Sequence, residues 1–306
     1  MIKPLDDIGT IVKLIADAAD LSEAEVHQNL VAESNGLGTN VIETMRANQI
    51  PHFVTSSKLD DFYENSAGFM YEITLWNACP FKQQMRDFVT SRLKKYKPDG
   101  ADIFCFGDGL GFDSAAFAIE GYQLKYYEPS LKSRTFANTV FEKNEVEVQQ
   151  LTSIDDITPA SLDAIVCLDV LEHVPRPQDI VAIFDQWLKP DGLLFVHAPF
   201  WAIHWARPTH LKENRHLSGN LKDLYGVHGF EALDSIGLWN PIVLQKKEAR
   251  PYKKTIGSRW RINAGRCVLK IAGWNCSFFM WAADRIAKPP KAWLTELRNY
   301  KPPQDG

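Results

Sequence analysis

Apolar residues in the first hundred positions recur every three or four residues, which is the spacing of amphipathic helices. This pattern predicts helices around residues 5–15 and 26–31. An aromatic-rich apolar stretch covers residues 62–76, and a further helix is predicted over residues 81–96. We therefore expect residues 1–98 to form a helical cap.

The pattern changes after the Lys-Pro-Asp-Gly sequence that ends at Gly100, where short apolar runs begin to alternate with amphipathic segments. Seven strands are predicted at residues 103–106, 124–127, 146–148, 164–168, 193–198, 230–234 and 242–245. Helices over residues 112–119 and 179–188 fit between them. This alternation predicts an α/β fold with a Rossmann-like, doubly wound, seven-stranded sheet in residues 99–248.

Residues 249–306 differ from the rest of the chain in both charge and aromatic content. The stretch from Lys246 onward holds 14 lysines and arginines against 4 acids, although the whole chain has a net charge of −4. A helix is predicted over residues 264–286. The tryptophans and phenylalanines of residues 249–306 are Trp260, Trp274, Phe278, Phe279, Trp281 and Trp293. Such a basic helical extension either packs against the acidic body or contacts an anionic partner.

Composition excludes several classes of protein. With 306 residues, 45% of them hydrophobic and 24% charged, the chain has enough apolar surface for one or two cores and does not resemble a disordered or fibrous protein. The five cysteines form no CxxC pair and are predicted to be buried, reduced thiols. No apolar signal region and no run long enough to span a membrane is evident, so we expect a cytoplasmic protein.

The strongest chemical signal is a glycine-rich turn directly after the first predicted strand. Gly107, Asp108, Gly109 and Gly111 follow that strand and precede a predicted helix. Glycines at such a turn let the backbone approach a ligand, while the helix presents its N-terminal amides. Glu128 stands 21 residues beyond Gly107, at the end of the second strand, where an acid can bind both hydroxyls of a ribose. The combination indicates a nucleotide-type cofactor.

The spacing of the glycines separates two cofactor classes. A dinucleotide-binding turn, G-x-G-x-x-G, needs its last glycine at position 112, which is Phe112. The G-x-G-x-G spacing, together with residues 162–177 and 184–199, resembles the class I S-adenosylmethionine (SAM)-dependent methyltransferases. In that resemblance these two segments correspond to the fourth strand, the following helix and the fifth strand, and the similarity covers about residues 100–247.

The resemblance implies SAM as cofactor and S-adenosylhomocysteine as its product. It also implies which positions surround the cofactor. The methionine portion is assigned to Gly107, Asp108, Gly109 and Gly111, the ribose to Glu128, and the adenine to Pro129, Ser130 and Leu131. Gln150 and Leu151 after the third strand, and Leu168 and Asp169 at the end of the fourth, complete the predicted cofactor site.

The candidate catalytic residues follow the fourth and fifth strands, where six of the eight histidines fall. Asp169, Glu172 and His173 are predicted to share one side of a helical turn, with His210 or His216 completing the site. This acid-x-x-Glu-His motif resembles that of metal-dependent 2′-O-methyltransferases of small RNAs and of ubiquinone-pathway O-methyltransferases. A divalent metal held by these residues is one alternative. We prefer a metal-free site in which His173 acts as base or positions the acceptor, and a structural role is the third alternative.

These features together predict an enzyme that methylates O or N of a metabolite or natural product. One alternative is a peptide or protein substrate, recognised by residues 1–98. Another is a catalytically silent SAM-fold scaffold, although the intact glycines and Glu128 count against it. The sequence makes no strong case for nucleic acid as a partner.

Overall fold

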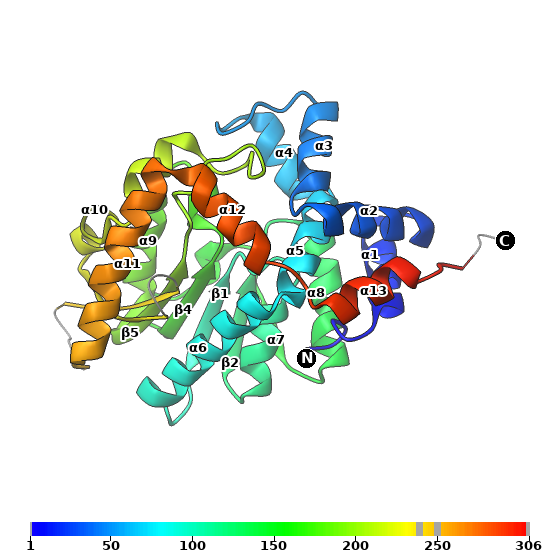
Figure 1. The fold of residues 1–306 in the computed structure, drawn as a ribbon. Coiled ribbons are helices and arrows are strands. Elements are labelled where there is room, and N and C mark those ends of the chain that lie inside the picture. Colours follow the sequence, from blue (N-terminus) through cyan, green and yellow to red (C-terminus); the bar gives the residue numbers. More distant parts are fainter. Residues whose placement is uncertain (1, 237–240, 248–251, 304–306) are drawn as a thin grey trace.

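The computed structural model describes residues 2–236, 241–247 and 252–303 (Figure 1). Within these residues, seven strands form one sheet in the order β3-β2-β1-β4-β5-β7-β6. The strands are β1 (Asp102–Phe106), β2 (Gln123–Tyr127), β3 (Val148–Gln150), β4 (Leu162–Leu168), β5 (Leu188–His197), β6 (Phe230–Ser235) and β7 (Ile242–Lys246). The predicted seven-stranded α/β sheet is confirmed, although β3 begins two residues later than expected.

The sheet is parallel from β3 to β5, and β7 runs antiparallel to both of its neighbours. Successive residues of β1 face opposite sides, because side chains alternate along a strand. Phe104 packs with α9 (Pro177–Trp187) and α10 (Leu221–Leu224) on one face. Ile103 and Cys105 pack with α6 (Pro80–Tyr96) and α7 (Phe112–Ile119) on the other. Both faces are thus covered, as in doubly wound sheets.

The N-terminal region contains six helices within the described residues. They are α1 (Ile8–Ala19), α2 (Glu23–Asn35), α3 (Thr39–Ala47), α4 (Ser57–Asn65), α5 (Gly68–Ala78) and α6. Helices α1, α2 and α5 share an apolar core with α8 (Leu131–Lys143), whereas α6 lies on the sheet itself. The division of the chain at residue 98 stays a prediction, but α6 packs with the sheet rather than with α1 and α2.

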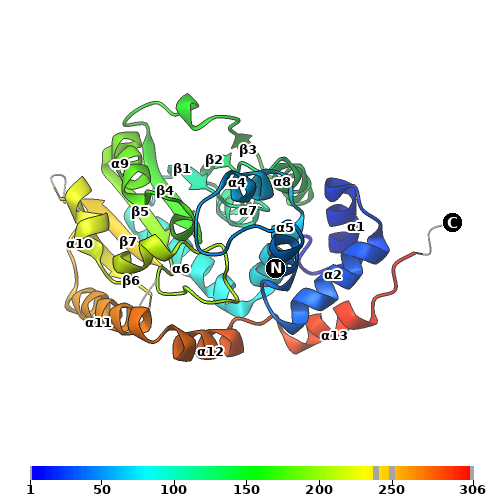
Figure 2. The ribbon, with the colours of Figure 1, turned by 90° about the horizontal axis from the view of Figure 1, so that it is seen from above.

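The C-terminal region crosses the molecule along one side (Figures 1 and 2). The helical structure predicted over residues 264–286 is present, but it begins earlier and is interrupted: the chain forms α11 (Ile256–Trp274) and α12 (Cys276–Ile286), separated at Asn275. The Asn275 side chain accepts a hydrogen bond from the Phe278 amide and so begins the new helix. Helix α13 (Lys291–Asn299) reaches the N-terminal helices, where the Trp293 indole donates to the Leu5 carbonyl oxygen at 2.9 Å.

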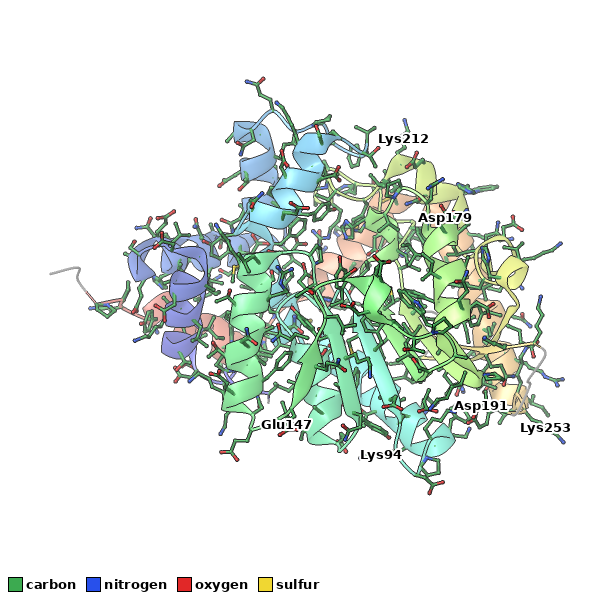
Figure 3. The ribbon with its side chains drawn as sticks, turned by 180° about the vertical axis from the view of Figure 1, so that it is seen from behind. Lys94, Glu147, Asp179, Asp191, Lys212 and Lys253 are labelled. Carbon is green, nitrogen blue, oxygen red and sulfur yellow. The ribbon has the colours of Figure 1, made fainter. Side chains whose placement is uncertain are left out.

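Charged side chains and one cysteine are exposed at the surface. Lys94, Glu147 and Asp179 are exposed and are labelled in Figure 3. Four cysteines are buried, but Cys267 on α11 is exposed, because it lies on the side of the helix that faces away from the sheet. Among the described residues, no helix is both long and apolar enough to cross a membrane.

Candidate active site

A cavity of about 570 Å³ lies at the carboxyl ends of β1, β2, β4 and β5. Its walls come from the glycine turn after β1, the loops after β2 and β4, the loop over residues 199–210, and helices α4, α5, α6 and α12. Because the strand order reverses between β1 and β4, this is the edge at which open α/β sheets bind ligands. The volume is in the range typical of small-molecule sites.

The glycine turn forms one wall of this cavity. Gly107 and Gly109 both have positive φ, at 70° and 58°. A Cβ on Gly107 would lie 2.7 Å from Val170 Cγ2, and one on Gly109 would lie 2.9 Å from Ile73 Cδ1. Both glycines line the cavity with bare backbone; their role in binding a cofactor stays a prediction. Gly111 does not line the cavity, and a Cβ there would lie 2.8 Å from Ala137 Cβ, so this glycine allows α7 to pack on α8.

Glu128 connects the end of β2 to the glycine turn. One carboxyl oxygen accepts a hydrogen bond from the Gly109 amide and the other accepts one from the Ser130 amide, both at 3.1 Å. Burial raises the pKa of Glu128 to about 7. Glu128, Pro129 and Ser130 all line the cavity, so the carboxyl group is placed where a ligand with two neighbouring hydroxyls could reach it.

Asp108 both lines the cavity and begins α7. Its carboxyl oxygens accept hydrogen bonds from the Asp113 amide at 3.1 Å and the Ser114 amide at 2.7 Å. Burial, reinforced by the neighbouring Asp113 carboxylate, raises the pKa of Asp108 to about 7. When it is ionised, above about pH 7, Asp108 can present negative charge to a cationic ligand while it stabilises the helix N-terminus.

A buried ion-pair network that the sequence analysis missed supports the same wall. Lys82 Nζ lies 2.8 Å from one oxygen of Asp113, and Arg86 Nε lies 2.7 Å from the other. Burial alone would raise the pKa of Asp113, but the two cations hold it below its usual value. Lys82 also lies 3.6 Å from Asp169, so it links the glycine turn to the loop after β4. The available signal was two cations four residues apart on one predicted helix.

Asp169 does not share a helical turn with Glu172 and His173, so that prediction is wrong. Asp169 has a positive φ of 62°, and the short 3-10 turn covers only Leu171–His173. The Asp169 carboxylate lines the cavity and accepts hydrogen bonds from Trp76 Nε1 at 2.9 Å and from the His197 ring. Although burial opposes it, His197 and Lys82 hold the pKa of Asp169 below its usual range.

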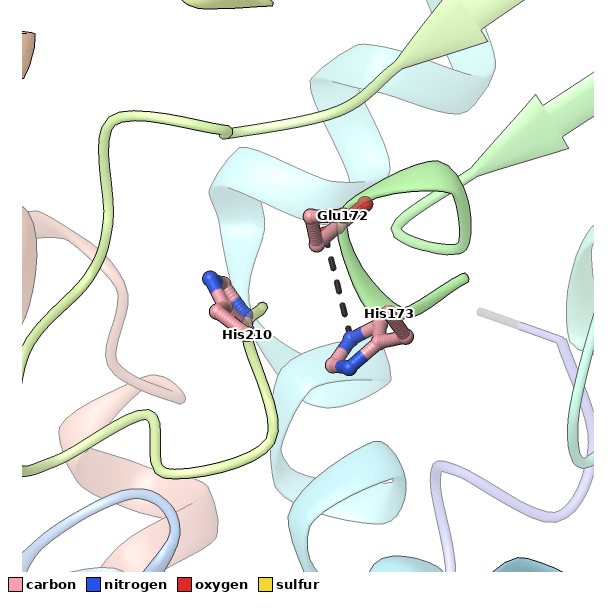
Figure 4. Close-up of side chains that lie close together, drawn as sticks. All are labelled: Glu172, His173 and His210. Carbon is pink, nitrogen blue, oxygen red and sulfur yellow. Dashed lines mark ion pairs between the residues drawn. The ribbon is translucent and has the colours of Figure 1, made fainter. Parts of the chain in front are cut away.

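Glu172, His173 and His210 lie close together (Figure 4), and all three line the cavity. Their potential ligand atoms are all within 4.8 Å of one another, and His173 Nε2 lies 3.9 Å from a Glu172 oxygen. The second Glu172 oxygen and His210 Nδ1 are buried without a hydrogen-bond partner. Burial raises the pKa of Glu172, lowers that of His173 to about 4 and lowers that of His210, so both rings are neutral near pH 7.

Aromatic side chains from the N-terminal region hold His173 in place. The Tyr63 hydroxyl lies 3.0 Å from His173 Nδ1, which is also 3.3 Å from the Thr209 carbonyl oxygen. Tyr63 and Phe69 stack on each other, and both rings contact the imidazole edge to face. The cap thus contributes directly to this group, a contact that no local motif in the sequence indicates.

The remaining predicted site residues divide into two sets. Leu168 lines the cavity as expected, whereas Leu151 is in the core below the sheet edge. Gln150 is hydrogen-bonded to Asn138 outside the cavity, and the side chain of Leu131 is 64% exposed at the start of α8. His216 is exposed and bonded to the Glu213 carbonyl oxygen of its own turn, so it cannot complete the site; His210 occupies that position.

Part of the chain that contains this site is similar to known methyltransferases. Residues 81–231 match the model of a methyltransferase domain. The chain is 32% identical over 114 residues to the ubiquinone biosynthesis O-methyltransferase of Xanthomonas campestris, covering 36% of this chain and 46% of that protein. It is 35% identical over 100 residues to the enzyme of the same name from Idiomarina loihiensis, covering 31% and 41%.

The matched part is limited, since the chain spans less than half the length of these curated relatives. Among solved structures, a protein of Pyrococcus horikoshii aligns at 11% identity with a TM-score of 0.45, covering 63% of this chain and all of that one. The matched residues 81–231 contain the glycine turn, Glu128 and the Glu172, His173 and His210 group. Over residues 81–231 the predicted resemblance to the class I SAM-dependent methyltransferase superfamily is confirmed.

Proposed function

We propose that the protein transfers a methyl group from SAM to a hydroxyl oxygen of a small-molecule acceptor. The observation that carries this proposal is the presence of two different groups in one cavity. Glu128 and the glycine turn line one side, and Glu172, His173 and His210 line the other. The names of the curated relatives, both O-methyltransferases, support the same reaction.

The residues around the glycine turn fit SAM. The space that a Cβ would need at Gly107 and Gly109 is taken by neighbouring side chains, so the backbone itself faces the cavity. Glu128 would accept hydrogen bonds from the two ribose hydroxyls, and Asp108 would lie toward the cationic end of the cofactor. When bound, SAM supplies a methyl group that is already activated by its sulfonium.

The acceptor would occupy the part of the cavity between α5, α12 and the loop over residues 199–210. The walls there are largely apolar and aromatic, with Phe69, Trp76, Trp201 and Met280 among them. This lining favours a ring-bearing hydroxyl compound over a peptide, because α12 contributes Met280, Ala283 and Ile286 to the wall and would obstruct an extended chain there. The aromatic walls would align the acceptor with the cofactor, which is the main contribution a protein makes to an in-line transfer.

His173 is the group best placed to hold the acceptor hydroxyl. Because burial lowers its pKa to about 4, the ring is neutral at physiological pH. When Nδ1 donates to the Thr209 carbonyl oxygen, Nε2 is left as an acceptor for the O–H proton. We therefore assign His173 the role of orienting the hydroxyl and receiving its proton as the new C–O bond forms.

The same residues also fit a divalent cation. Glu172, His173 and His210 offer one carboxylate and two neutral imidazoles, and two of their atoms have no partner. Nitrogen-rich sets of this kind suit Zn²⁺ and other transition ions better than Mg²⁺. A bound ion would lower the pKa of the acceptor hydroxyl and fix its direction. Activity that survives a chelator would exclude this alternative, and calorimetry with Zn²⁺ alone would test binding without activity.

The proposed function is tested by methyl transfer from labelled SAM to a panel of small phenols and catechols. His173→Ala is expected to lower kcat by about 10²–10⁴-fold, the usual contribution of a positioned acid or base. His216→Ala, a matched surface histidine, is expected to have no effect. A wild-type protein that binds SAM but methylates none of these compounds would instead favour the silent scaffold.

A further inference from the structure

Helices α11 and α12 expose an unusual number of large apolar side chains. On α11, Ile256, Trp260, Ile271 and Trp274 have exposed fractions of 87%, 64%, 58% and 91%. On α12, Phe278 and Trp281 are 58% and 53% exposed. Large apolar side chains that gather on one surface, unlike scattered ones, mark a site of interaction.

On each helix these side chains lie on the side opposite the buried residues. On α11 the exposed positions 256, 260, 263, 267, 271 and 274 follow each other at three- and four-residue spacing. The opposite side carries the buried residues Ser258, Ile262, Gly265 and Leu269, among others, and packs on β6. On α12, Cys276 and Met280 face inward, so Phe278 and Trp281 face outward. We call these exposed residues the aromatic face.

Cations accompany the aromatic face. Arg259, Lys270 and Lys288 are exposed, and none of them forms an ion pair with any residue that the structure describes. The guanidinium of Arg285 lies over the Trp281 ring, 3.7 Å from its centroid. Only one acid, Asp284, occurs in residues 255–288, against six lysines and arginines. The partner of this face is therefore expected to be both apolar and anionic.

We propose that the aromatic face docks the protein on an anionic lipid membrane surface. Trp rings beside lysines and arginines are the residues that favour the boundary between headgroups and acyl chains. Helices α11 and α12 lie along one outer side of the molecule, so both can contact the same surface (Figures 1 and 2). A second copy of this chain is a poorer partner, because a symmetric contact would bring Arg259, Lys270 and Lys288 against like charges.

The test is co-sedimentation of the full chain with vesicles. We expect binding to vesicles that contain phosphatidylglycerol and much weaker binding to phosphatidylcholine alone. Replacing Arg259, Lys270 and Lys288 together by Gln should weaken binding by roughly a hundredfold, from about fivefold for each cation. Replacing Trp274, Phe278 and Trp281 by Ala should weaken it at least about tenfold. The matched control is Ile119→Ala with Val227→Ala, two exposed apolar residues outside the aromatic face.

Two further measurements distinguish loss of membrane binding from loss of folding. Calorimetry with S-adenosylhomocysteine checks that each variant is folded, because the substituted residues do not line the cavity. Quenching of wild-type tryptophan fluorescence by brominated lipids reports insertion without any substitution. Vesicle binding needs neither SAM nor acceptor, so its failure leaves the proposed function untouched.

Three outcomes would overturn membrane docking. The first is a wild-type protein that does not sediment with anionic vesicles. The second is binding that persists in both triple variants. The third is a different partner for the aromatic face. Either the protein forms a dimer that the Trp and Phe substitutions dissociate, or it binds RNA in a salt-sensitive way and does not bind vesicles.

Discussion

The two sides of the cavity are assembled in different ways. The cofactor side comes from residues 107–113 and 128–130, two short segments that follow neighbouring strands. The acceptor side combines five segments that are far apart in the sequence: α4, α5, the turn after β4, the loop over residues 199–210 and α12. A site made from consecutive turns can be recognised as a motif, whereas one made by packing of distant segments cannot.

Lys82 joins the two sides, since it contacts Asp113 on the cofactor side and Asp169 near the acceptor. Asp113→Ala would leave Lys82 and Arg86 buried with their shared partner removed. We expect the free energy of unfolding to fall by about 3–5 kcal/mol, measured by urea denaturation. Glu120→Ala removes an exposed ion pair to Lys94 and should change little. If both substitutions lowered the free energy of unfolding equally, the buried ion pairs of Asp113 would contribute no more to stability than an exposed pair.

Substitution of Glu128 tests whether its carboxylate binds the ribose of the cofactor. Glu128→Ala should weaken S-adenosylhomocysteine binding at least about tenfold, since hydrogen bonds to a charged group contribute about 1.5–3 kcal/mol. Isothermal calorimetry measures this directly. Gln150→Ala is the matched control, because that side chain lies outside the cavity. If Gln150→Ala had the larger effect, the assignment of the ribose to Glu128 would be wrong.

The pH dependence of cofactor binding also tests whether ionised Glu128 binds the ribose, and the expected effect is smaller. Burial raises the pKa of Glu128 to about 7, so the carboxyl is protonated below that pH and ionised above it. Ribose hydroxyls donate to the ionised form, and affinity should therefore fall as pH falls. Between pH 8 and pH 6 the decrease is up to about tenfold for one group with this pKa.

The control for this measurement is Glu128→Gln, which cannot ionise and should flatten the profile. Asp108 also has a pKa raised to about 7 by burial, so Asp108→Asn separates the two contributions. A profile that Asp108→Asn flattens and Glu128→Gln leaves unchanged would assign the titration to Asp108 instead.

Most of the fold could be predicted because its signals are local. The seven apolar runs matched seven strands, and the predicted helix over residues 112–119 has the bounds of α7. The interruption between α11 and α12 has a local cause as well. Asn275 caps a new helix, but a polar residue inside an apolar stretch does not by itself reveal whether a helix bends, ends or continues.

The catalytic prediction was partly wrong for a physical reason. Spacing of i, i+3 and i+4 brings residues together only in a helix, and the backbone at Asp169 has left-handed geometry instead. Asp169 therefore turns toward His197 and Trp76, and His210 from a distant loop takes the place beside Glu172 and His173. Spacing could not choose between His210 and His216, since that depends on which side of a loop becomes buried.

The sequence by itself determined the α/β sheet, the glycine turn with Glu128, and the resemblance of residues 81–231 to methyltransferases. These rest on the alternation of apolar residues and on backbone freedom at a few glycines, which act over short stretches of chain. Only the tertiary structure decided the partners of Asp169, the Glu172, His173 and His210 group, the Lys82 network and the outward aromatic face. Each of these depends on burial, and burial is set by which distant segments pack against each other.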